Sequence, residues 1–325
     1  MIDGQGRPIR YLRLSVTDRC NLSCVYCRSA ACGEPVPRED LLSLEEIVRV
    51  VQIACELGID RVRITGGEPL VRQGVVKLIR MLRESCDIAD LSLSTNGLRL
   101  ASLASELRRA GLDRVNVSLD SLKPARFRWI TRGGNLDDVL AGIERAQEVG
   151  LEPVKVNTVV MKGINDDEVV DLAHFALERG LTIRFIELMP IGEAIRSGLW
   201  RSAYLSVSEV RRRLAMELPL LPAEPTQGGG PAQYFRVEGS QGAIGFIAPL
   251  SVPFCARCNR IRLTATGELR PCLAHDEGLS LREPLRRGDL ERVRELLIRA
   301  IREKPQGHGW KQNQPTTTTM AGLGG

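Results

Sequence analysis

One pattern recurs four times in the first 190 residues and restricts the possible folds more than any other feature. In each copy a helical stretch ends at a glycine, and a hydrophobic residue and a short β-rich run follow. Glycine adopts the left-handed conformation at little cost, so it ends a helix and turns the chain. The copies are CELGIDRVRIT (55–65), RRAGLDRVNVSL (108–119), QEVGLEPVKVNTVV (147–160) and LERGLTIRFIEL (177–188).

Two further strand-like runs, LRLSV (12–16) and LSLST (91–95), bring the number of expected strands to six. Strands that alternate with helices form parallel sheets with right-handed crossovers. Six such units fall short of the eight in a closed barrel, so a partial barrel and an open doubly wound sheet both remain possible. The helical periods between the strands are 44–57, 75–82, 98–110, 136–149 and 167–177.

The residue types that carry chemistry come directly after the expected strands. Ligands of parallel α/β folds bind at the carboxyl ends of the strands, so we expect these residues to share one site. They are the cysteines at 20–27, Gly-Gly-Glu-Pro at 66–69, Thr-Asn-Gly at 95–97, Ser118, Asp120 and Met189.

Cys20, Cys24 and Cys27, the first triplet, have the spacing C-x3-C-x2-C. Three thiolates can hold three irons of a [4Fe–4S] cubane and leave the fourth iron open to a small molecule. Structural zinc usually takes four protein ligands, and no His follows this triplet nearby. The spacing therefore predicts an iron–sulfur site with one open position.

Cys255, Cys258 and Cys272, the second triplet, have the spacing C-x2-C-x13-C. From the residues alone two interpretations remain open. One is a zinc site with His275 as the fourth ligand, and the other is a second iron–sulfur cluster. Cys32 lies near enough in the sequence to the first triplet to be a spare ligand.

Composition limits the compartment and the partners. Nine cysteines are an odd number, and a chain of 325 residues is far larger than the secreted domains that depend on disulfides. The N-terminus has no secretory signal, and no run of about 18 apolar residues predicts a membrane span. We expect a reduced, soluble, cytoplasmic protein. A net charge of +5 with only 4% aromatic residues favours a basic pocket for a phosphorylated small molecule over nucleic acid.

After about residue 190 the repeating pattern ends. The Pro- and Gly-rich segment 217–233 reads as a linker or irregular loop, and YFRVEG and GAIGFIAPL read as antiparallel strands. A helical stretch is expected at 279–302. The tail, residues 306–325, contains a threonine run (316–319) and is expected to be mobile. This organisation predicts a barrel domain at 1–215, an extension at 216–305 and the tail.

The run from Cys20 to Cys27, with the Gly-Gly-Glu-Pro turn, resembles the radical S-adenosylmethionine superfamily. The second triplet, Arg260 and Arg262 just after it, and the Gly-Gly end resemble the GTP 3',8-cyclase family of molybdenum cofactor biosynthesis. That resemblance implies a partial (β/α)6 TIM-like barrel with a C-terminal extension that carries a second iron–sulfur site. Two departures are Ser94, where the family has Thr, and Arg28, where Met is common.

The resemblance also implies an activity and a set of contacts. Members convert GTP into (8S)-3',8-cyclo-7,8-dihydroguanosine 5'-triphosphate, with a 5'-deoxyadenosyl radical that removes the ribose C3' hydrogen. Two [4Fe–4S] clusters would serve it: the first triplet's would chelate S-adenosylmethionine, and the second triplet's would bind guanine. By resemblance S-adenosylmethionine would contact Tyr26, Gly67, Ser118 and Met189, and GTP would contact Arg13, Arg63, Ser94, Lys155, Arg260 and Arg262.

The resemblance implies further partners: a reductant of unknown identity, cyclic pyranopterin monophosphate synthase as the downstream enzyme, and a second copy of the chain in a homodimer. It also implies that Gly324 and Gly325 enter the catalytic cavity. Neither a membrane nor nucleic acid is expected as a partner. Two alternatives remain: another radical S-adenosylmethionine enzyme with an auxiliary cluster, and a zinc-stabilised RNA-binding module.

Overall fold

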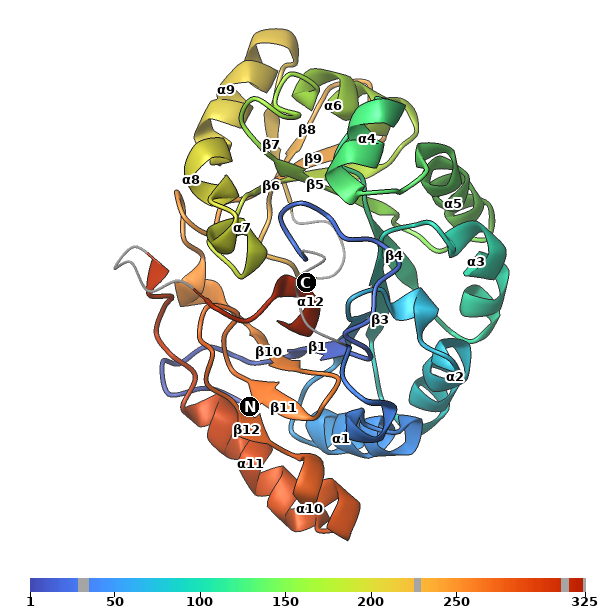
Figure 1. Ribbon diagram of the computed structural model, residues 1–325, viewed down its shortest axis with the longest axis vertical. Helices are drawn as coiled ribbons and strands as arrows, with labels where there is room; N and C mark the ends of the chain where they lie inside the picture. The colour runs from blue at the N-terminus through green and yellow to red at the C-terminus, as the bar shows by residue number, and fades with distance from the viewer. Residues whose placement is uncertain (29–34, 225–228, 311–315, 324–325) are drawn as a thin grey trace.

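A curved sheet forms the centre of the molecule, with most of the helices on its outer side (Figure 1). The computed structural model describes residues 1–28, 35–224, 229–310 and 316–323. Within these residues the sheet has twelve strands in the order β12-β11-β10-β1-β2-β3-β4-β5-β6-β9-β8-β7. The alternating first half of the sequence therefore supplies the middle of the sheet, and the second half supplies both edges.

The six expected strands are present and each pairs in parallel with the next, as the alternation predicted. The strand-like ends of the four copies are VRI (62–64), VNVSL (115–119), VKVNTVV (154–160) and IRFIEL (183–188). These four runs, and the runs 12–16 and 91–95, begin and end within one residue of an observed strand. The partial barrel implied by the family resemblance is confirmed. The strands are β1 (Tyr11–Ser15), β2 (Arg61–Thr65), β3 (Asp90–Thr95), β4 (Arg114–Ser118), β5 (Lys155–Val160) and β6 (Thr182–Glu187).

Amphipathic helices cover the outer face of this partial barrel. The first begins with a capping box, in which Ser43 Oγ accepts a hydrogen bond from Glu46 N and the Glu46 carboxylate accepts one from Ser43 N. The short helix α4 was not expected, although a proline at its first turn is a typical start signal. The helices are α1 (Leu44–Glu56), α2 (Val75–Ser85), α3 (Leu100–Arg109), α4 (Pro124–Thr131), α5 (Leu136–Glu148) and α6 (Val169–Glu178).

Three short strands extend the sheet beyond β6. They are β7 (Leu221–Ala223), β8 (Gln233–Arg236) and β9 (Ala243–Ile247), and they follow the helices α7 (Glu193–Arg196), α8 (Leu199–Ala203) and α9 (Val207–Glu217). β8 and β9 are antiparallel as expected, and β9 is parallel to β6. The prediction of a loop across 217–233 was wrong in part, because β7 forms an edge strand there. An edge position tolerates Pro222, which cannot donate to a ladder.

At the other edge, β10 (Arg260–Leu263) pairs in parallel with β1, and β11 (Glu268–Arg270) and β12 (Leu279–Ser280) follow antiparallel. The single helix expected at 279–302 was wrong: the chain is first extended in β12 and then forms two helices. Gly288, with φ +73°, ends the first of them. The remaining helices are α10 (Arg282–Arg287), α11 (Leu290–Arg302) and α12 (Met320–Leu323).

Strands from both sides of the expected boundary at 215/216 belong to one sheet, and the boundary itself lies within α9. The division into domains stays a prediction. The described part of the tail lies against the barrel, with α12 near the centre of the view in Figure 1 and Leu323 buried. The expected mobility of residues 306–325 stays a prediction. Cys32, Gly324 and Gly325 lie outside the described residues.

Alternation along the strands separates the core from the site. On β1, Leu12 and Leu14 are fully buried in the apolar layer beneath the helices, and Arg13 lies between them on the opposite face. The same alternation places Arg63 between Val62 and Ile64 on β2. The inner face of the partial barrel is therefore the polar one.

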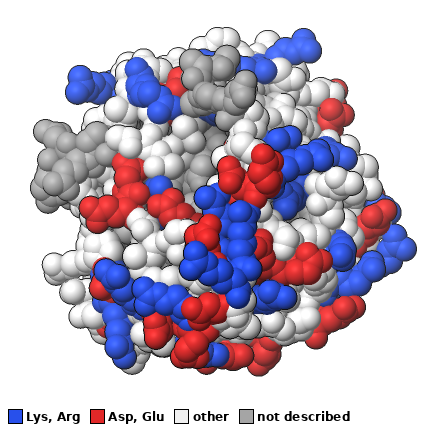
Figure 2. All heavy atoms as spheres, turned by 60° about the horizontal axis from the view of Figure 1, so that its bottom comes forward, with Lys and Arg blue, Asp and Glu red and all other residues white. Residues whose placement is uncertain are grey.

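The charged residues of the outer surface are mixed in sign on the face drawn in Figure 2, where Lys and Arg alternate with Asp and Glu. The net charge of +5 is thus not gathered into one field on that face. Among the described helices none has the length and apolar character needed to cross a membrane.

Candidate active site

One cavity of about 320 Å³ lies inside the partial barrel and is lined by most of the residues that the sequence analysis proposed. Both cysteine triplets line it. Its other lining residues include Tyr26, Gly67, Ser118 and Met189, expected for S-adenosylmethionine, and Arg13, Arg63, Ser94, Arg260 and Arg262, expected for GTP. Lys155 is the one proposed contact outside the lining; it lies buried in β5.

The first triplet lies in the loop after β1 and is braced from two sides. Inside the loop, Cys27 N donates to Cys24 O at 2.9 Å. From outside, the end of α4 accepts two backbone hydrogen bonds, Val25 N to Ile130 O at 2.9 Å and Ser23 N to Thr131 O at 3.2 Å. The unexpected helix α4 therefore fixes the position of the cysteine loop.

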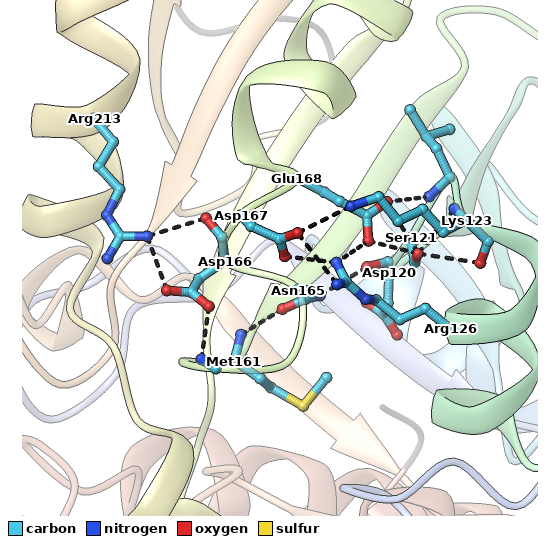
Figure 3. Close-up of polar contacts among 12 residues, drawn as sticks. Asp120, Ser121, Lys123, Arg126, Met161, Asn165, Asp166, Asp167, Glu168 and Arg213 are labelled. Carbon is cyan, nitrogen blue, oxygen red and sulfur yellow. Dashed lines mark hydrogen bonds and ion pairs between the residues drawn. The ribbon is translucent and has the colours of Figure 1, made fainter.

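Tyr26 is held by the carboxylate of Asp120 at the end of β4. Its hydroxyl donates to Asp120 Oδ2 at 2.7 Å, and Val159 N donates to Asp120 Oδ1 at 2.8 Å. Asn165 Nδ2 donates to the Asp120 carbonyl oxygen at 2.7 Å, in the network drawn in Figure 3. Burial raises the pKa of Asp120 to about 6, although the bonds from Tyr26 and Val159 oppose this rise.

Glu68 fastens the Gly-Gly-Glu-Pro turn to the end of β3. Its buried carboxylate accepts from Thr95 Oγ1 at 2.8 Å and from Asn96 N at 2.6 Å. Burial raises the pKa of Glu68 to about 7 despite these hydrogen bonds. A Cβ on Gly67 would lie 2.4 Å from Arg19 O, so the glycine lets the turn pack against the segment that leads into Cys20.

The second triplet lines the same cavity as the first and comes from the C-terminal part of the chain. Cys255 begins a 3-10 turn (Cys255–Arg257) before β10, and Cys272 follows β11. Burial raises the pKa of Cys258, but Lys304 and Arg260 lower it to a net value below the ordinary one. One ring nitrogen of His275, the alternative zinc ligand, lies 3.1 Å from Gly307 O.

The described residues contain no group of three His, Cys, Asp or Glu side chains close enough to hold a single metal ion. The thiols of each triplet nevertheless reach the same cavity. Three soft thiol donors are the ligands that iron–sulfur clusters take, and the nearby carboxylates of Asp120 and Glu68 accept hydrogen bonds from Tyr26 and Thr95. The first triplet thus fits a cluster by the chemistry of its donors.

Three arginines form a row across the inner face of the sheet. Arg13 on β1 pairs Cα to Cα with Arg262 on β10 and, on its other side, with Arg63 on β2. Burial lowers the pKa of Arg63 and of Arg262 to about 10 each. We call Arg262, Arg13 and Arg63 the arginine row. Such a row of neighbouring cations is suited to an anion with several charges.

Arg260 and Tyr11 extend this basic wall. Arg260 shares a face of β10 with Arg262, as the alternation predicted, and its guanidinium lies 5.7 Å from the ring centroid of Tyr11. The Nε atoms of Arg260 and Arg262 are buried and have no hydrogen-bond partner among the described residues. Buried donors without partners indicate a ligand that supplies acceptors.

The sequence reasoning missed Arg184, which lines the cavity from β6 and is buried. Its Nε also has no hydrogen-bond partner in the described part of the chain. The signal was available, because Arg184 interrupts an apolar strand in the same way as Arg13 and Arg63 do. Asn157 on β5, whose Oδ1 is likewise unpartnered there, lines the cavity too and was not proposed.

The amino ends of β3 and β4 contain a different kind of arginine. Arg114 binds Asp90 with two hydrogen bonds, Nε to Oδ1 at 2.9 Å and Nη2 to Oδ2 at 2.7 Å, and both residues are buried. Lys155 lies nearby, with its ammonium 5.5 Å from the Tyr234 ring centroid. Burial, and then Arg184, Arg114 and Arg63, lower the pKa of Lys155 to about 6.

Two models of protein families match the chain. The Radical SAM superfamily matches residues 14–176, and Molybdenum Cofactor Synthesis C matches residues 181–310. The GTP 3',8-cyclase of Heliobacterium modesticaldum is 48% identical over 317 residues, which cover 95% of this chain and 96% of that protein. The chain belongs to the GTP 3',8-cyclase family.

Other relatives agree with this membership. The GTP 3',8-cyclase of Moorella thermoacetica is 47% identical over 331 residues, with all of both chains covered. Among solved structures, Streptococcus suis SuiB bound to S-adenosylmethionine matches with a TM-score of 0.64 at 15% identity, over 85% of this chain and 64% of that chain. At this identity the SuiB match supports the fold alone.

Membership in the radical S-adenosylmethionine superfamily brings a [4Fe–4S] cluster and S-adenosylmethionine as cofactors of this chain. The donor chemistry of the first triplet fits that cluster, and the cavity beside it has unpartnered polar atoms such as Asn157 Oδ1 for a polar ligand. The assignment of each contact residue stays a prediction.

Proposed function

We propose that this chain converts GTP into (8S)-3',8-cyclo-7,8-dihydroguanosine 5'-triphosphate in molybdenum cofactor biosynthesis. The observation that supports this most directly is one cavity lined by both cysteine triplets and by the arginine row. A radical source and a nucleotide must lie within reach of each other for a hydrogen to be transferred between them. A shared cavity meets that requirement.

The residues of the first triplet's wall hold and orient S-adenosylmethionine in this proposal. When bound to Cys20, Cys24 and Cys27, the cluster supplies the electron that cleaves S-adenosylmethionine to the 5'-deoxyadenosyl radical. Tyr26, Gly67, Ser118 and Met189 hold the rest of the cofactor. Ser118 is exposed at the end of β4, and Met189 and Cys272 both pack against the apolar cluster that contains Trp310 and Leu323.

The arginine row and Arg260 bind the triphosphate of GTP in this proposal. Hydrogen bonds from a charged donor to phosphate oxygens stabilise by about 1.5–3 kcal/mol each, so several arginines suffice without a P-loop. Arg184 is added to the set, because it is buried, lines the cavity and has an unpartnered Nε among the described residues. Ser94, which accepts from Asn116 Nδ2 at 3.3 Å, lies on the same wall.

A second [4Fe–4S] cluster on Cys255, Cys258 and Cys272 is part of the proposal, with the guanine of GTP at its open iron. It is supported by the position of this triplet in the same cavity, next to Arg260 and Arg262. Iron analysis of anaerobic protein separates the possibilities. About eight irons per chain support two clusters, whereas about four irons with one zinc support the zinc site at His275.

The tail is proposed to reach the same cavity. Met320 and Ala321 of α12 line it, and Gly324 and Gly325 follow directly in the sequence. Deletion of both glycines is expected to abolish cyclisation of GTP with the iron content unchanged. Unchanged cyclisation would reject this part of the proposal.

The test of the whole proposal is anaerobic turnover with dithionite, S-adenosylmethionine and GTP. Formation of 5'-deoxyadenosine should depend on GTP, and the cyclised nucleotide should appear with the mass of GTP. ATP serves as the matched nucleotide control, and Cys20→Ala should abolish cleavage of S-adenosylmethionine. Cleavage that is indifferent to GTP would favour another radical enzyme with an auxiliary cluster. The natural reductant, the downstream synthase, a homodimer and a cytoplasmic location stay predictions.

A further inference from the structure

The threonine run 316–319, which composition marked as part of a mobile tail, is bound by a single carboxylate. Asp276 Oδ2 accepts from Thr317 N at 2.8 Å and from Thr317 Oγ1 at 2.7 Å. Asp276 Oδ1 accepts from Thr318 N at 3.1 Å and from Thr318 Oγ1 at 2.7 Å. Each carboxylate oxygen therefore takes the amide and the hydroxyl of one threonine.

Arg270 on β11 completes this contact. Its Nη1 donates to Thr318 Oγ1 at 3.0 Å and lies 3.7 Å from Asp276 Oδ1. Its Nη2 donates to Glu268 Oε2 at 2.9 Å, which fixes the guanidinium from its own strand. Burial would raise the pKa of Asp276, but the bonds from Thr317 and Thr318 lower it well below the ordinary value. The carboxylate is thus the ionised acceptor at neutral pH.

Independent contacts hold the residue before this pair, and Gly192 closely approaches the residue after it. Thr316 O accepts from Gly192 N at 2.9 Å, and Thr316 Oγ1 accepts from Trp310 Nε1 at 3.1 Å. Gly192 has φ +46°, and a Cβ there would lie 2.9 Å from Thr319 Cα. Only glycine allows the two backbones to approach so closely in this conformation.

The four threonines lead directly into α12. Met320 and Ala321 line the cavity with both cysteine triplets, and Leu323 is buried in the apolar cluster that contains Trp310. Asp276 itself belongs to the segment that follows Cys272 in the sequence. The contact therefore joins the end of the chain to the segment that carries the second triplet.

From these contacts we infer that Asp276 and Arg270 form a clamp that seats Thr317 and Thr318 and thereby positions the C-terminal tail for the reaction. Both are positioning residues, because they act on the cavity through the tail. The chemical role that the clamp serves rests on the proposed function of the tail. The seating of the tail does not, and it can be measured by itself.

Limited proteolysis measures the seating directly. Trypsin cleavage after Lys311 releases residues 312–325, which contain no further Lys or Arg. Asp276→Asn and the double variant Thr317→Val/Thr318→Val should each raise this cleavage rate about tenfold, because an ionic acceptor or its hydroxyl donors are lost. Thr317→Ser/Thr318→Ser keeps the hydroxyls and should restore the slow rate. Asp137→Asn, an exposed carboxylate on α5, is the matched control.

Kinetics measure the consequence in the same holoenzymes, prepared anaerobically and matched for iron content. In Asp276→Asn, kcat for cyclisation should fall about tenfold while KM for S-adenosylmethionine stays unchanged. Thr317→Val/Thr318→Val should show the same fall, and Thr317→Ser/Thr318→Ser should keep the native kcat. Gly192→Ala should reproduce both effects from the opposite side of the tail. Unchanged tryptic release in Asp276→Asn would overturn the clamp. Faster release with unchanged kcat would overturn its role in positioning. Full activity after deletion of Gly324 and Gly325 would instead reject the proposed function of the tail, and the proteolysis result would stand.

Discussion

Arg13 on β1 and Arg262 on β10 pair Cα to Cα across neighbouring parallel strands, although they lie far apart in the sequence. Arg63 on β2 pairs with Arg13 on the other side. Neighbouring cations repel one another, and removal from water weakens the screening of that repulsion. The pKa of Arg13 is accordingly well below its ordinary value, first through burial and then through Arg262 and Arg63. The arginine row therefore stabilises the complex with a polyanion relative to the ligand-free protein.

Arg262→Met should therefore have opposite effects on stability and on binding. The variant should raise the Tm of the ligand-free protein, because one of three repelling charges is removed and its buried Nε has no hydrogen-bond partner among the described residues. It should weaken GTP binding about 10- to 100-fold, because about 1.5–3 kcal/mol of charged hydrogen bonding is lost. Thermal unfolding with and without GTP measures both effects. Arg109→Met, an exposed arginine on α3, is the control; a Tm that falls in Arg262→Met would contradict the account.

Lys155 predicts that GTP binding takes up a proton. Its pKa is lowered to about 6, so it is neutral at pH 7.5 in the free protein. A polyphosphate nearby raises that pKa, so affinity should fall as pH rises above about 6 towards the pKa of the complex. The charged or titratable groups that face Lys155 include Arg63, Asp90, Arg114, Arg184 and Tyr234.

Calorimetry of GTP binding between pH 7.5 and 8.5, in buffers of different ionisation enthalpy, measures this uptake. Phosphate groups are fully ionised in that range, since their second pKa is about 6. Lys155→Met should abolish the proton uptake, and the native chain without any uptake would show that GTP does not reach Lys155.

Tyr26 and Asp120 should act as a pair in binding S-adenosylmethionine. Tyr26→Phe removes the donor of the 2.7 Å hydrogen bond, and Asp120→Asn removes the charge of its acceptor. Each change should weaken S-adenosylmethionine binding about tenfold, and the double variant should be little worse than either single one. Binding isotherms on iron-loaded protein measure this coupling. Independent, multiplicative losses would contradict a shared role in holding the cysteine loop.

Asp90 should be required for folding rather than for chemistry. Asp90→Ala leaves Arg114 charged and buried beside Arg63, Lys155 and Arg184, and a broken buried pair costs about 3–5 kcal/mol. Glu148→Ala breaks the exposed pair with Arg145 and should cost at most about 1 kcal/mol. Urea unfolding compares the two variants, and similar midpoints would contradict the distinction.

Local sequence patterns predicted most of the fold. Glycines at the helix ends and β-branched runs located six strands to within one residue, because the end of a helix and the length of a strand depend on a few neighbouring residues. Local patterns failed where pairing with a distant strand determines the structure. Extended β12 and the stop at Gly288 replaced one expected helix, and pairing with β8 made an edge strand of β7 in a Pro-rich segment.

The site divides in the same way. Cysteine spacing and charged residues inside apolar strands pointed to the cavity residues, since both are local patterns. The register of Arg13 with Arg262 was out of reach, because it depends on a strand pair formed across the whole sequence. The clamp of Asp276 on Thr317 was also out of reach, because isolated Asp and Thr residues in loops carry no pattern.

Transfer of the C3' hydrogen of GTP tests the central claim most directly. Anaerobic turnover with GTP that carries deuterium at ribose C3' should place that deuterium in 5'-deoxyadenosine, as measured by mass spectrometry. This result requires that the 5'-deoxyadenosyl radical and the ribose of GTP meet in one cavity. Unlabelled 5'-deoxyadenosine formed together with consumed GTP would contradict it.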